Sequence, residues 1–365
     1  EARAVFGPWP EALANARRVA QDCRLEMRLG EPVFPRYRPP DGETPQAFLR
    51  RLCREGMRRR YGAPGPEAER RLEKELRIIE ELGFTEYFIF VWDITELVRR
   101  RGIATVGRGS GASSIVSYLL GITQADPLRY GISFERFLHA RREDMPDLDV
   151  DLCWIKRDEV LESIYEKYGE DRVAMVATHN TLRLRSAFRE VARAWGIPPE
   201  TVDRIGRELP HDSPRTVGQE LGGTSAAERV EPADLRAIAE HAQKIRGFPR
   251  HLGIHCGGMV IGDRRLESRV PLERAAKGVV VTQFEKDAVE RIGLVKMDFL
   301  GNHGLTIRDE AARLVGERRG APLTAEDIPD RDGATGRALR RGETLSCCQL
   351  ESPAMRGLLR QLRVS

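Results

Sequence analysis

The sequence lacks the features that mark secreted and membrane proteins. No charged segment leads into an apolar leader, and no apolar run reaches the roughly 18 residues that a membrane span requires. The six cysteines are scattered without a CxxC pair or a repeated spacing, which argues against a disulfide framework and a cysteine-rich zinc site. We therefore expect free thiols, a cytoplasmic location and no membrane partner.

No charge of one sign dominates the chain. Its 60 Lys and Arg residues oppose 56 Asp and Glu residues, and the net charge of +4 does not by itself indicate a polyanion partner. Internal repeats and low-complexity tracts are also absent, whereas 41% hydrophobic content over 365 residues is enough for a substantial core. Because the sequence begins at Glu1 and stops at Ser365 just after a helical pattern, we expect a piece of a longer protein.

Hydrophobic periodicity predicts helices near the start of the chain. Two helices separated by a Pro-rich turn are expected between residues 10 and 60, the second starting at Gly42 or Thr44. The segment 67–82 combines helical apolar spacing with dense charge pairs, which predicts a surface helix. Its inward positions are Leu72, Leu76 and Ile79.

The rest of the chain predicts an α/β fold. Residues 84–152 have the pattern of an α/β unit, and residues 158–246 are expected to be mostly helical and are rich in Arg. Strand signals return at 258–261, 279–282 and 294–300. The simplest arrangement is a mixed sheet with helices, into which a helical subdomain is inserted.

An acidic strand is the first candidate site. In PDLDVD (146–151), alternation puts Asp147, Asp149 and Asp151 on one face and apolar residues on the other. Acids two apart on a strand are roughly 6.6 Å apart at Cα, near enough for leaning carboxylates to share hard cations. The alternative is an acidic face that is simply solvated.

A glycine-rich turn precedes this strand. Arg108, Gly109 and Ser110 lie in VGRGSGAS, just before an apolar helical pattern. Glycines before a helix let the backbone approach a phosphate, and the serine and arginine add donors. It is not a Walker A loop, because no Lys-Ser/Thr follows the last glycine at the required place. A plain helix cap is the alternative.

Two further patterns are charged. On the strand GLVKMDFLG (293–301), Lys296 and Asp298 share a face, either as a site or as a surface ion pair. In the segment 181–193, arginines recur every four residues with little acid to neutralise them. This stripe suits a phosphodiester backbone, although it could be a solvated helix face. The candidate DNA-binding residues are Arg183, Arg185, Arg189 and Arg193.

His251 and His255 are four apart, as zinc ligands on a helix can be. The surrounding glycines disfavour a helix, so a contact to nucleic acid or a satisfied structural pair is favoured over a metal site.

Together these patterns match metal-dependent nucleotidyl transfer. The reaction needs acids to hold two cations and donors to hold a triphosphate. A phosphate-binding turn, a DxD strand and a later strand with a single Asp supply both.

With these motifs the sequence resembles the bacterial C-family DNA polymerases, which are the alpha subunit of DNA polymerase III and its error-prone relatives. The resemblance extends over nearly the whole chain in the order that the family has. It is carried by GRGSGASSIVSYLLGIT (107–123), DPLRYGISFERFL (126–138), MPDLDVDLCWIKRDEV (145–160), RHLGIHCGGMVI (250–261), VTQFEKDAVERIGLVKMDFLG (281–301) and QLESPAMRGLL (349–359).

The resemblance implies that Asp147, Asp149 and Asp298 are the catalytic ligands of two Mg²⁺ ions, for which Mn²⁺ can substitute, with Asp151 as a supporting acid. Residues that would bind the triphosphate of the incoming nucleotide are Gly109, Ser110, Arg136 and Lys296, beside Arg108 from the turn.

The resemblance also implies a domain plan. A palm like the nucleotidyltransferase fold of polymerase beta would comprise 1–178, with the N-terminal helices, and 257–305. A thumb that tracks the primer–template duplex would be 179–256, and 306–365 would start the fingers. The sequence departs from the family at Asn302 and His303, where an apolar residue is expected, and at Cys348, where an aromatic is expected.

We therefore expect a template-directed DNA polymerase core, with primer–template DNA and deoxynucleotide triphosphates as partners. In the full-length protein, a sliding clamp and other replisome or repair subunits are further expected partners. The alternatives are a duplex-DNA-binding fragment without activity of its own and a nucleotidyltransferase acting on a small molecule. RLRSAFREV and RHLGIHCGGMVI favour the error-prone branch.

Overall fold

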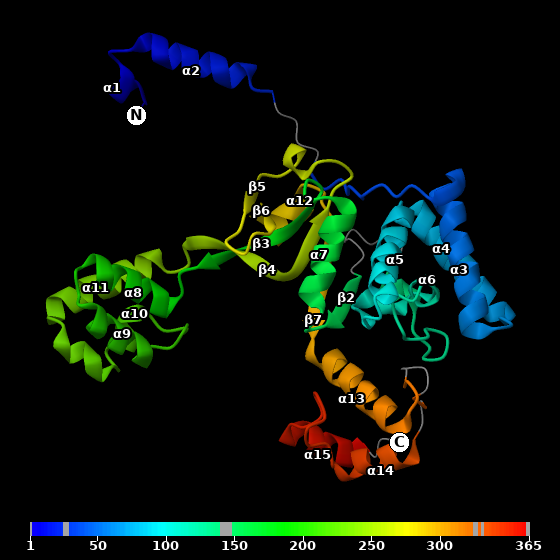
Figure 1. Ribbon diagram of the computed structural model, residues 1–365. Helices are drawn as coiled ribbons and strands as arrows, with labels where there is room; N and C mark the ends of the chain where they lie inside the picture. Colours follow the sequence, from blue (N-terminus) through cyan, green and yellow to red (C-terminus); the bar gives the residue numbers. More distant parts are fainter. Residues whose placement is uncertain (1, 25–28, 139–147, 324–327, 330–331, 363–365) are drawn as a thin grey trace.

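The computed structural model describes residues 2–24, 29–138, 148–323, 328–329 and 332–362. Within these ranges one mixed sheet forms the centre of the molecule, with strand order β1-β2-β7-β4-β3-β6-β5 (Figure 1). The pairs β2–β7 and β3–β6 are parallel, and the other neighbours are antiparallel. The strands are β1 (Thr105–Arg108), β2 (Asp149–Cys153), β3 (Val173–Thr181), β4 (Pro249–Ile261), β5 (Leu272–Arg274), β6 (Val280–Glu285) and β7 (Lys296–Asn302).

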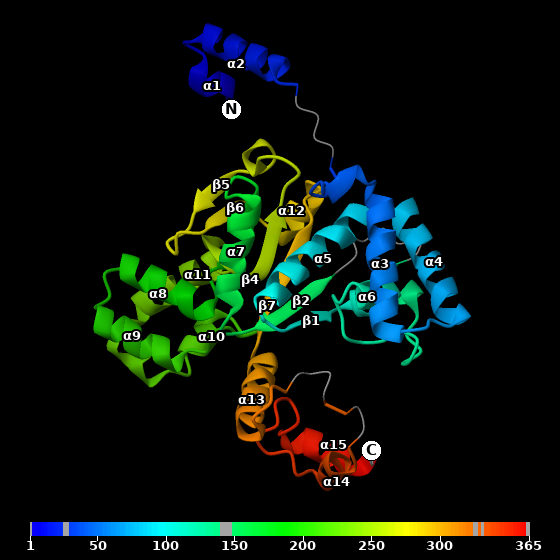
Figure 2. The same cartoon turned by 45° about the vertical axis from the view of Figure 1, so that its right-hand side comes forward.

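Helices cover the sheet and extend from its ends. Those before the insertion are α1 (Ala2–Phe6), α2 (Pro10–Asp22), α3 (Pro45–Tyr61), α4 (Pro66–Glu81), α5 (Thr85–Arg100), α6 (Ile115–Leu119) and α7 (Arg157–Tyr168). Those that follow are α8 (Leu184–Ala194), α9 (Pro199–Glu208), α10 (Val217–Leu221), α11 (Pro232–Ile245), α12 (Lys286–Arg291), α13 (His303–Arg319), α14 (Gly333–Arg341) and α15 (Pro353–Leu362). In Figures 1 and 2, α1 and α2 lie apart from the sheet.

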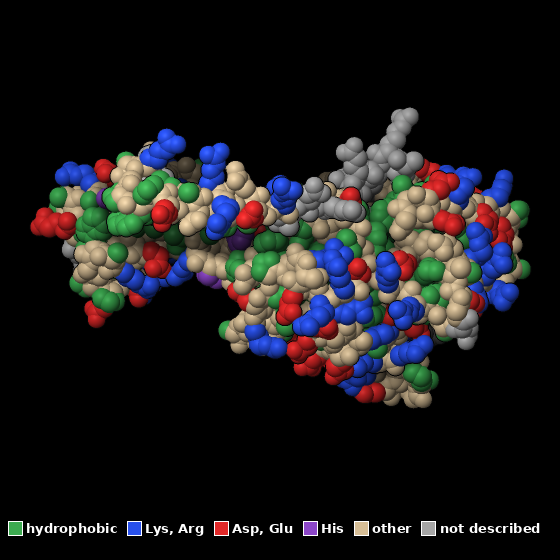
Figure 3. Space-filling model, turned by 90° about the horizontal axis from the view of Figure 1, so that it is seen from above, with side chains coloured by type: hydrophobic (Ala, Val, Ile, Leu, Met, Phe, Trp, Pro, Cys, Tyr) green, Lys and Arg blue, Asp and Glu red, His purple; other side chains and the backbone are tan. Residues whose placement is uncertain are grey.

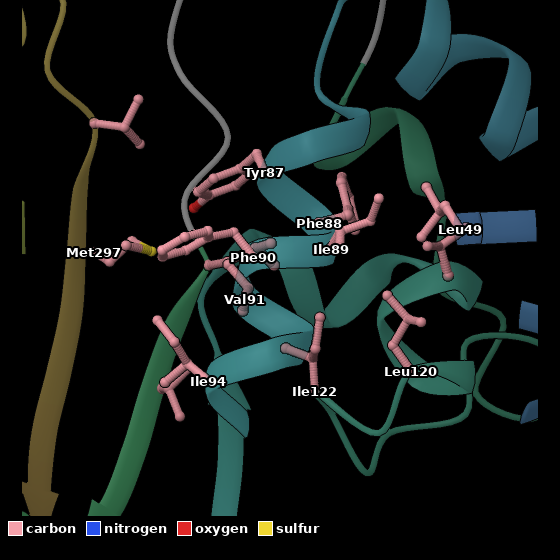
Figure 4. Close-up of a cluster of buried hydrophobic side chains, with 14 of the residues drawn as sticks. Leu49, Tyr87, Phe88, Ile89, Phe90, Val91, Ile94, Leu120, Ile122 and Met297 are labelled. Carbon is pink, nitrogen blue, oxygen red and sulfur yellow. The ribbon is translucent and has the colours of Figure 1, made fainter. Parts of the chain in front are cut away.

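The largest core is built around α5. This helix is apolar on nearly all sides, and Figure 4 shows Phe90 directed toward Met297 of β7 while Leu49 of α3 lies on the opposite side. A helix that is apolar all round must be buried between layers. Consequently α5 separates the sheet from the outer helices α3 and α4 (Figure 2).

The helices α8 to α11 form a separate unit with its own apolar core, which includes Phe188, Val202 and Ile238. They are inserted between β3 and β4, whose outer parts pair from Ala177 opposite Ile254 to Thr181 opposite Pro249. This two-stranded ribbon carries the unit away from the sheet, as Figure 1 shows at the left. The predicted insertion of a helical subdomain into one mixed sheet is confirmed.

Several local predictions are confirmed. Thr44 caps α3 by accepting from the Ala47 N–H at 3.2 Å. The three later strand signals overlap β4, β6 and β7, and all six cysteines are free thiols. None of the described helices is long and apolar enough to cross a membrane.

Two predictions were incomplete. Residues 173–181 lie in the segment expected to be mostly helical, yet they form β3, whose first five residues are all buried. A short continuous apolar run does not distinguish a buried strand from a buried helix. In addition, β4 begins at Pro249, well before the expected strand at 258–261, because its glycines weaken the strand signal.

Candidate active site

Acidic residues from β2 and β7 meet on one face of the sheet. Val150 pairs in parallel with Phe299, so Asp149 lies beside Asp298 one residue earlier in the same register. Val150 and Phe299 are each 1% exposed on the opposite face. The predicted alternation is therefore confirmed for Asp149 and Asp151, whereas Asp147 lies outside the described residues.

Arg108 lies over both β2 acids. Strand β1 pairs antiparallel with β2, which places Arg108 opposite Asp149. Its Nη2 lies 3.6 Å from Asp149 Oδ2, and its Nε lies 3.3 Å from Asp151 Oδ1. The Arg108 side chain is 54% exposed, in contrast to 14% for Asp149 and 8% for Asp151. Arg108, which the sequence predicted to bind the nucleotide, thus lies on the solvent side of these two acids.

Lys296 and Asp298 form an ion pair in which Lys296 Nζ donates to Asp298 Oδ2. Their predicted position on one face is confirmed. Each side chain is 14% exposed, so this is not the surface pair that was considered as the alternative. This largely buried pair lies on the same face as the β2 acids and is therefore included in the candidate site.

Two carboxylate oxygens at the site have unused hydrogen-bonding capacity. Asp298 Oδ1 and Asp151 Oδ1 are buried and have no hydrogen-bond partner, although Arg108 lies at ion-pair distance from the latter. Buried polar atoms are normally satisfied. Unsatisfied carboxylate oxygens suit a hard divalent cation. The described residues nevertheless contain no group of three or more His, Cys, Asp or Glu side chains arranged to hold a metal.

His255 approaches Asp298 in a way that the sequence did not predict. Its Nδ1 accepts from the Gly258 N–H at 2.6 Å and lies 3.7 Å from Asp298 Oδ1. Burial lowers the pKa of His255, an effect that Asp298 opposes. Gly258 pairs with Asp298, and a Cβ at this position would lie 2.8 Å from His255 Nδ1, so glycine leaves room for the imidazole.

His251 belongs to a different contact. Its Nε2 lies 3.1 Å from Asn180 Nδ2 on the β3–β4 ribbon. Both histidines lie on β4, so the prediction that the glycines disfavour a helix is confirmed. Each histidine has its own partners, and the two form no joint site.

The Gly-Ser turn lies at the same edge as the acids, because it directly follows Arg108. Gly109 adopts a φ of 79°, a conformation that favours glycine. A 3₁₀ turn, Ser110–Ser113, comes next, and Ser114 caps the five-residue helix α6. Exposed Arg136 lies in a second 3₁₀ turn, Phe134–Arg136, which packs against the first.

Helix α4 supports this turn through a buried carboxylate. Glu75, 0% exposed, accepts from Ser114 Oγ at 2.7 Å and from Arg71 Nε at 2.5 Å. Arg71 also donates to the carbonyls of Ser113 and Ile132 at 3.2 and 3.0 Å. The predicted surface helix is confirmed, because Leu72, Leu76 and Ile79 are buried and most of its other residues are exposed. Two of its charged residues, Arg71 and Glu75, additionally hold the Gly-Ser turn, which the sequence did not predict.

The chain is similar to known proteins over most of its length. Residues 47–301 match the family described as the bacterial DNA polymerase III alpha NTPase domain, and residues 304–365 match the finger domain of the same subunit. The chain belongs to the bacterial DNA polymerase III alpha family.

Relatives from two branches of this polymerase family match at similar identity. A DNA polymerase III subunit alpha from Halalkalibacterium halodurans is 37% identical over 100% of this chain and 33% of its own length. An error-prone DNA polymerase from Symbiobacterium thermophilum is 40% identical over 98% of this chain and 33% of its own length. The alpha subunit of DNA polymerase III from Escherichia coli K12 is 37% identical over 98% of this chain and 32% of its own length. The chain thus spans about a third of the length of these relatives.

The arginine stripe of this polymerase-family chain is largely engaged within the helical unit. Arg185 Nε donates to the Leu209 carbonyl at 2.8 Å, and Arg189 lies 3.3 Å from Asp203 on α9. The outer two arginines have acidic neighbours as well: Arg183 with Asp212 at 3.0 Å, and Arg193 with Glu190 at 3.9 Å. The expectation that little acid neutralises the stripe was therefore wrong.

Proposed function

We propose that this chain is part of the catalytic core of a template-directed DNA polymerase, which adds deoxynucleotides to a primer 3′ hydroxyl. The observation that carries the proposal is Asp149 beside Asp298 on parallel strands, with the Gly109 turn at the same edge. Membership of the polymerase family supports the same reaction.

Asp149 and Asp298, with Asp147 outside the described residues, would hold two Mg²⁺ or Mn²⁺ ions. Bound there, the cations would activate the primer hydroxyl and neutralise charge on the triphosphate. The unsatisfied Asp298 Oδ1 fits this role.

The remaining charges of the site suit the incoming nucleotide. Lys296 and Arg108 would offset phosphate charge, while Gly109, Ser110 and Arg136 would provide donors around the turn. The contribution of these residues is electrostatic and positional, because phosphoryl transfer needs no protein nucleophile.

We further propose that the sheet is a polymerase-beta-like palm, comprising 1–178 and 257–305, that 179–256 is a thumb, and that 306–365 starts the fingers. The helical unit on its projecting ribbon supports the thumb assignment. Arg183 and Arg193, 56% and 54% exposed, are better placed for the DNA backbone than Arg185 and Arg189. Figure 3 shows basic and acidic side chains interspersed over this unit, at the left.

For the intact protein, we propose a cytoplasmic location and partnership with a sliding clamp and other replisome or repair subunits. Family membership supports these assignments.

Primer extension by the intact protein tests the proposed reaction. Asp298→Ala should abolish incorporation, whereas Asp287→Ala, which changes an exposed acid of α12, should leave it unchanged. Duplex binding without incorporation by the wild type would instead support a DNA-binding module.

A further inference from the structure

Asn302 uses both ends of its side-chain amide at the junction of β7 and α13. Its Nδ2 donates to Asp151 Oδ2 at 2.8 Å. Its Oδ1 accepts from the backbone N–H groups of Gly304 and Leu305 at 2.8 and 3.4 Å, which caps α13. An amide is planar, so it cannot turn without weakening one of these two contacts.

Asp151 is held between two strands by this contact. One carboxylate oxygen faces Asn302 of β7, and the other lies 3.3 Å from Arg108 Nε of β1. Because its side chain is only 8% exposed, water offers little replacement for a lost partner. Asn302 therefore fixes the orientation of an acid next to Asp149 and Asp298.

The first turn of α13 also contacts Trp154, the residue that follows β2. The Trp154 ring stacks on His303 with centroids 4.7 Å apart, and the backbone N–H of Trp154 donates to Thr306 Oγ1 at 2.9 Å. A Cβ at Gly301 would come within 2.8 Å of Trp154 Cδ1, so glycine leaves the indole its place. The α13 end of the Asn302 contact is consequently well anchored.

We propose that Asn302 is a positioning residue, which ties the Asp151 carboxylate to the first turn of α13 and thereby keeps the acidic row aligned for nucleotidyl transfer. This inference rests on the proposed polymerase function. Asn302 acts through Asp151 and needs no contact with the reacting atoms.

The two roles of Asn302 can be separated by substitution. Asn302→Asp keeps an oxygen that caps α13, because Asp is as good an N-cap as Asn. It also removes the donor to Asp151 and places a like charge there. Asn302→Leu removes both contacts. Asp332→Ala is the matched control, because it removes the cap of α14 without touching the site.

The test is single-turnover nucleotide incorporation by the intact protein, together with thermal unfolding. Asn302→Asp should lower the maximal rate by roughly 10- to 100-fold, the range for partners that orient metal-site ligands, with nearly unchanged apparent nucleotide affinity. Its melting temperature should fall, because the buried Asp151 carboxylate loses its donor and gains a like charge. Asn302→Leu should lower the rate as well, and should lower the melting temperature further because it also removes the cap of α13. Asp332→Ala should affect the melting temperature alone.

A double variant provides a further check. Adding Asp151→Asn to Asn302→Asp restores a hydrogen bond with donor and acceptor exchanged, and should recover part of the lost rate. A wild-type rate in Asn302→Asp, or no recovery in the double variant, would overturn the positioning role while leaving the polymerase function standing. A wild type that incorporates no nucleotide would overturn the proposed function and this inference with it.

Discussion

The charged residues of β2 and β7 lie together on one face of the sheet, whereas most arginines of α8 contact other residues of the helical unit. Asp149, Asp298 and Lys296 share one face, with unsatisfied oxygen at Asp298. By contrast, Arg185 and Arg189 reach α9 or the residue after it. Strand alternation determines which charges lie together, but a helix repeat leaves open whether the shared face meets solvent or another helix.

The largest effect is expected where a helix charge is most deeply buried. Glu75→Ala should lower the free energy of unfolding by about 3–5 kcal/mol, because it leaves Arg71 largely buried without its carboxylate. Urea denaturation measures this change. Glu81→Ala on the same helix breaks only an exposed pair with Arg77 and should cost less than about 0.5 kcal/mol. Equal effects of the two variants would show that burial does not distinguish these charges.

A somewhat smaller effect is expected from the basic residue of the sheet. Lys296→Met should reduce nucleotide incorporation by about 100-fold, or roughly 2.7 kcal/mol, because Asp298 loses its partner and the triphosphate a positive charge. Lys286→Met, at an exposed position in α12, is the control. If both variants kept the wild-type incorporation rate, Lys296 would be a structural residue only.

The arginines of α8 offer a paired comparison. Arg189→Ala should destabilise the helical unit by about 1 kcal/mol, through loss of the Asp203 contact and of packing over Gly206. Arg193→Ala should leave the free energy of unfolding unchanged. It should reduce the magnitude of the slope of log duplex affinity against log salt concentration by about one, because one phosphate contact is lost. The measurements are denaturation and DNA affinity against salt. The opposite pattern would reverse the assignment of the two residues.

The smallest effect concerns the segment before Arg136. Hydrogen bonds from Lys74 and Ser133 lower the pKa of Glu135 to about 2. Because the folded-state pKa is lowered, this pair stabilises the fold above the ordinary pKa of 4.5 and ceases to do so as pH falls toward 2. Lys74→Ala should move the pKa of Glu135 upward, which NMR titration of the carboxyl group would show. An unchanged value would mean that Lys74 is not its main partner.

The sequence predicted the sheet-borne part of the site better than its supports. Alternation placed Asp149 with Asp151 and Lys296 with Asp298, since period two follows from backbone geometry alone. Residues far apart in sequence supply the rest: Glu75 lies 39 positions from Ser114, and Asn302 lies 151 positions from Asp151. Such contacts depend on tertiary packing, which local patterns do not encode. The acidic partners Asp203 and Asp212 of the arginine stripe were not predicted for the same reason. Strand β3 was missed because a short apolar run does not distinguish a buried strand from a buried helix.

The most direct measurement of the central claim is Mn²⁺ binding by the intact protein with primer–template and a deoxynucleotide triphosphate present. Wild type, Asp149→Asn and the exposed control Asp287→Asn would be compared. The claim that Asp149 and Asp298 form a nucleotidyl-transfer site predicts binding that requires nucleotide, is lost in Asp149→Asn and is kept in the control. Identical Mn²⁺ binding by all three proteins would contradict it.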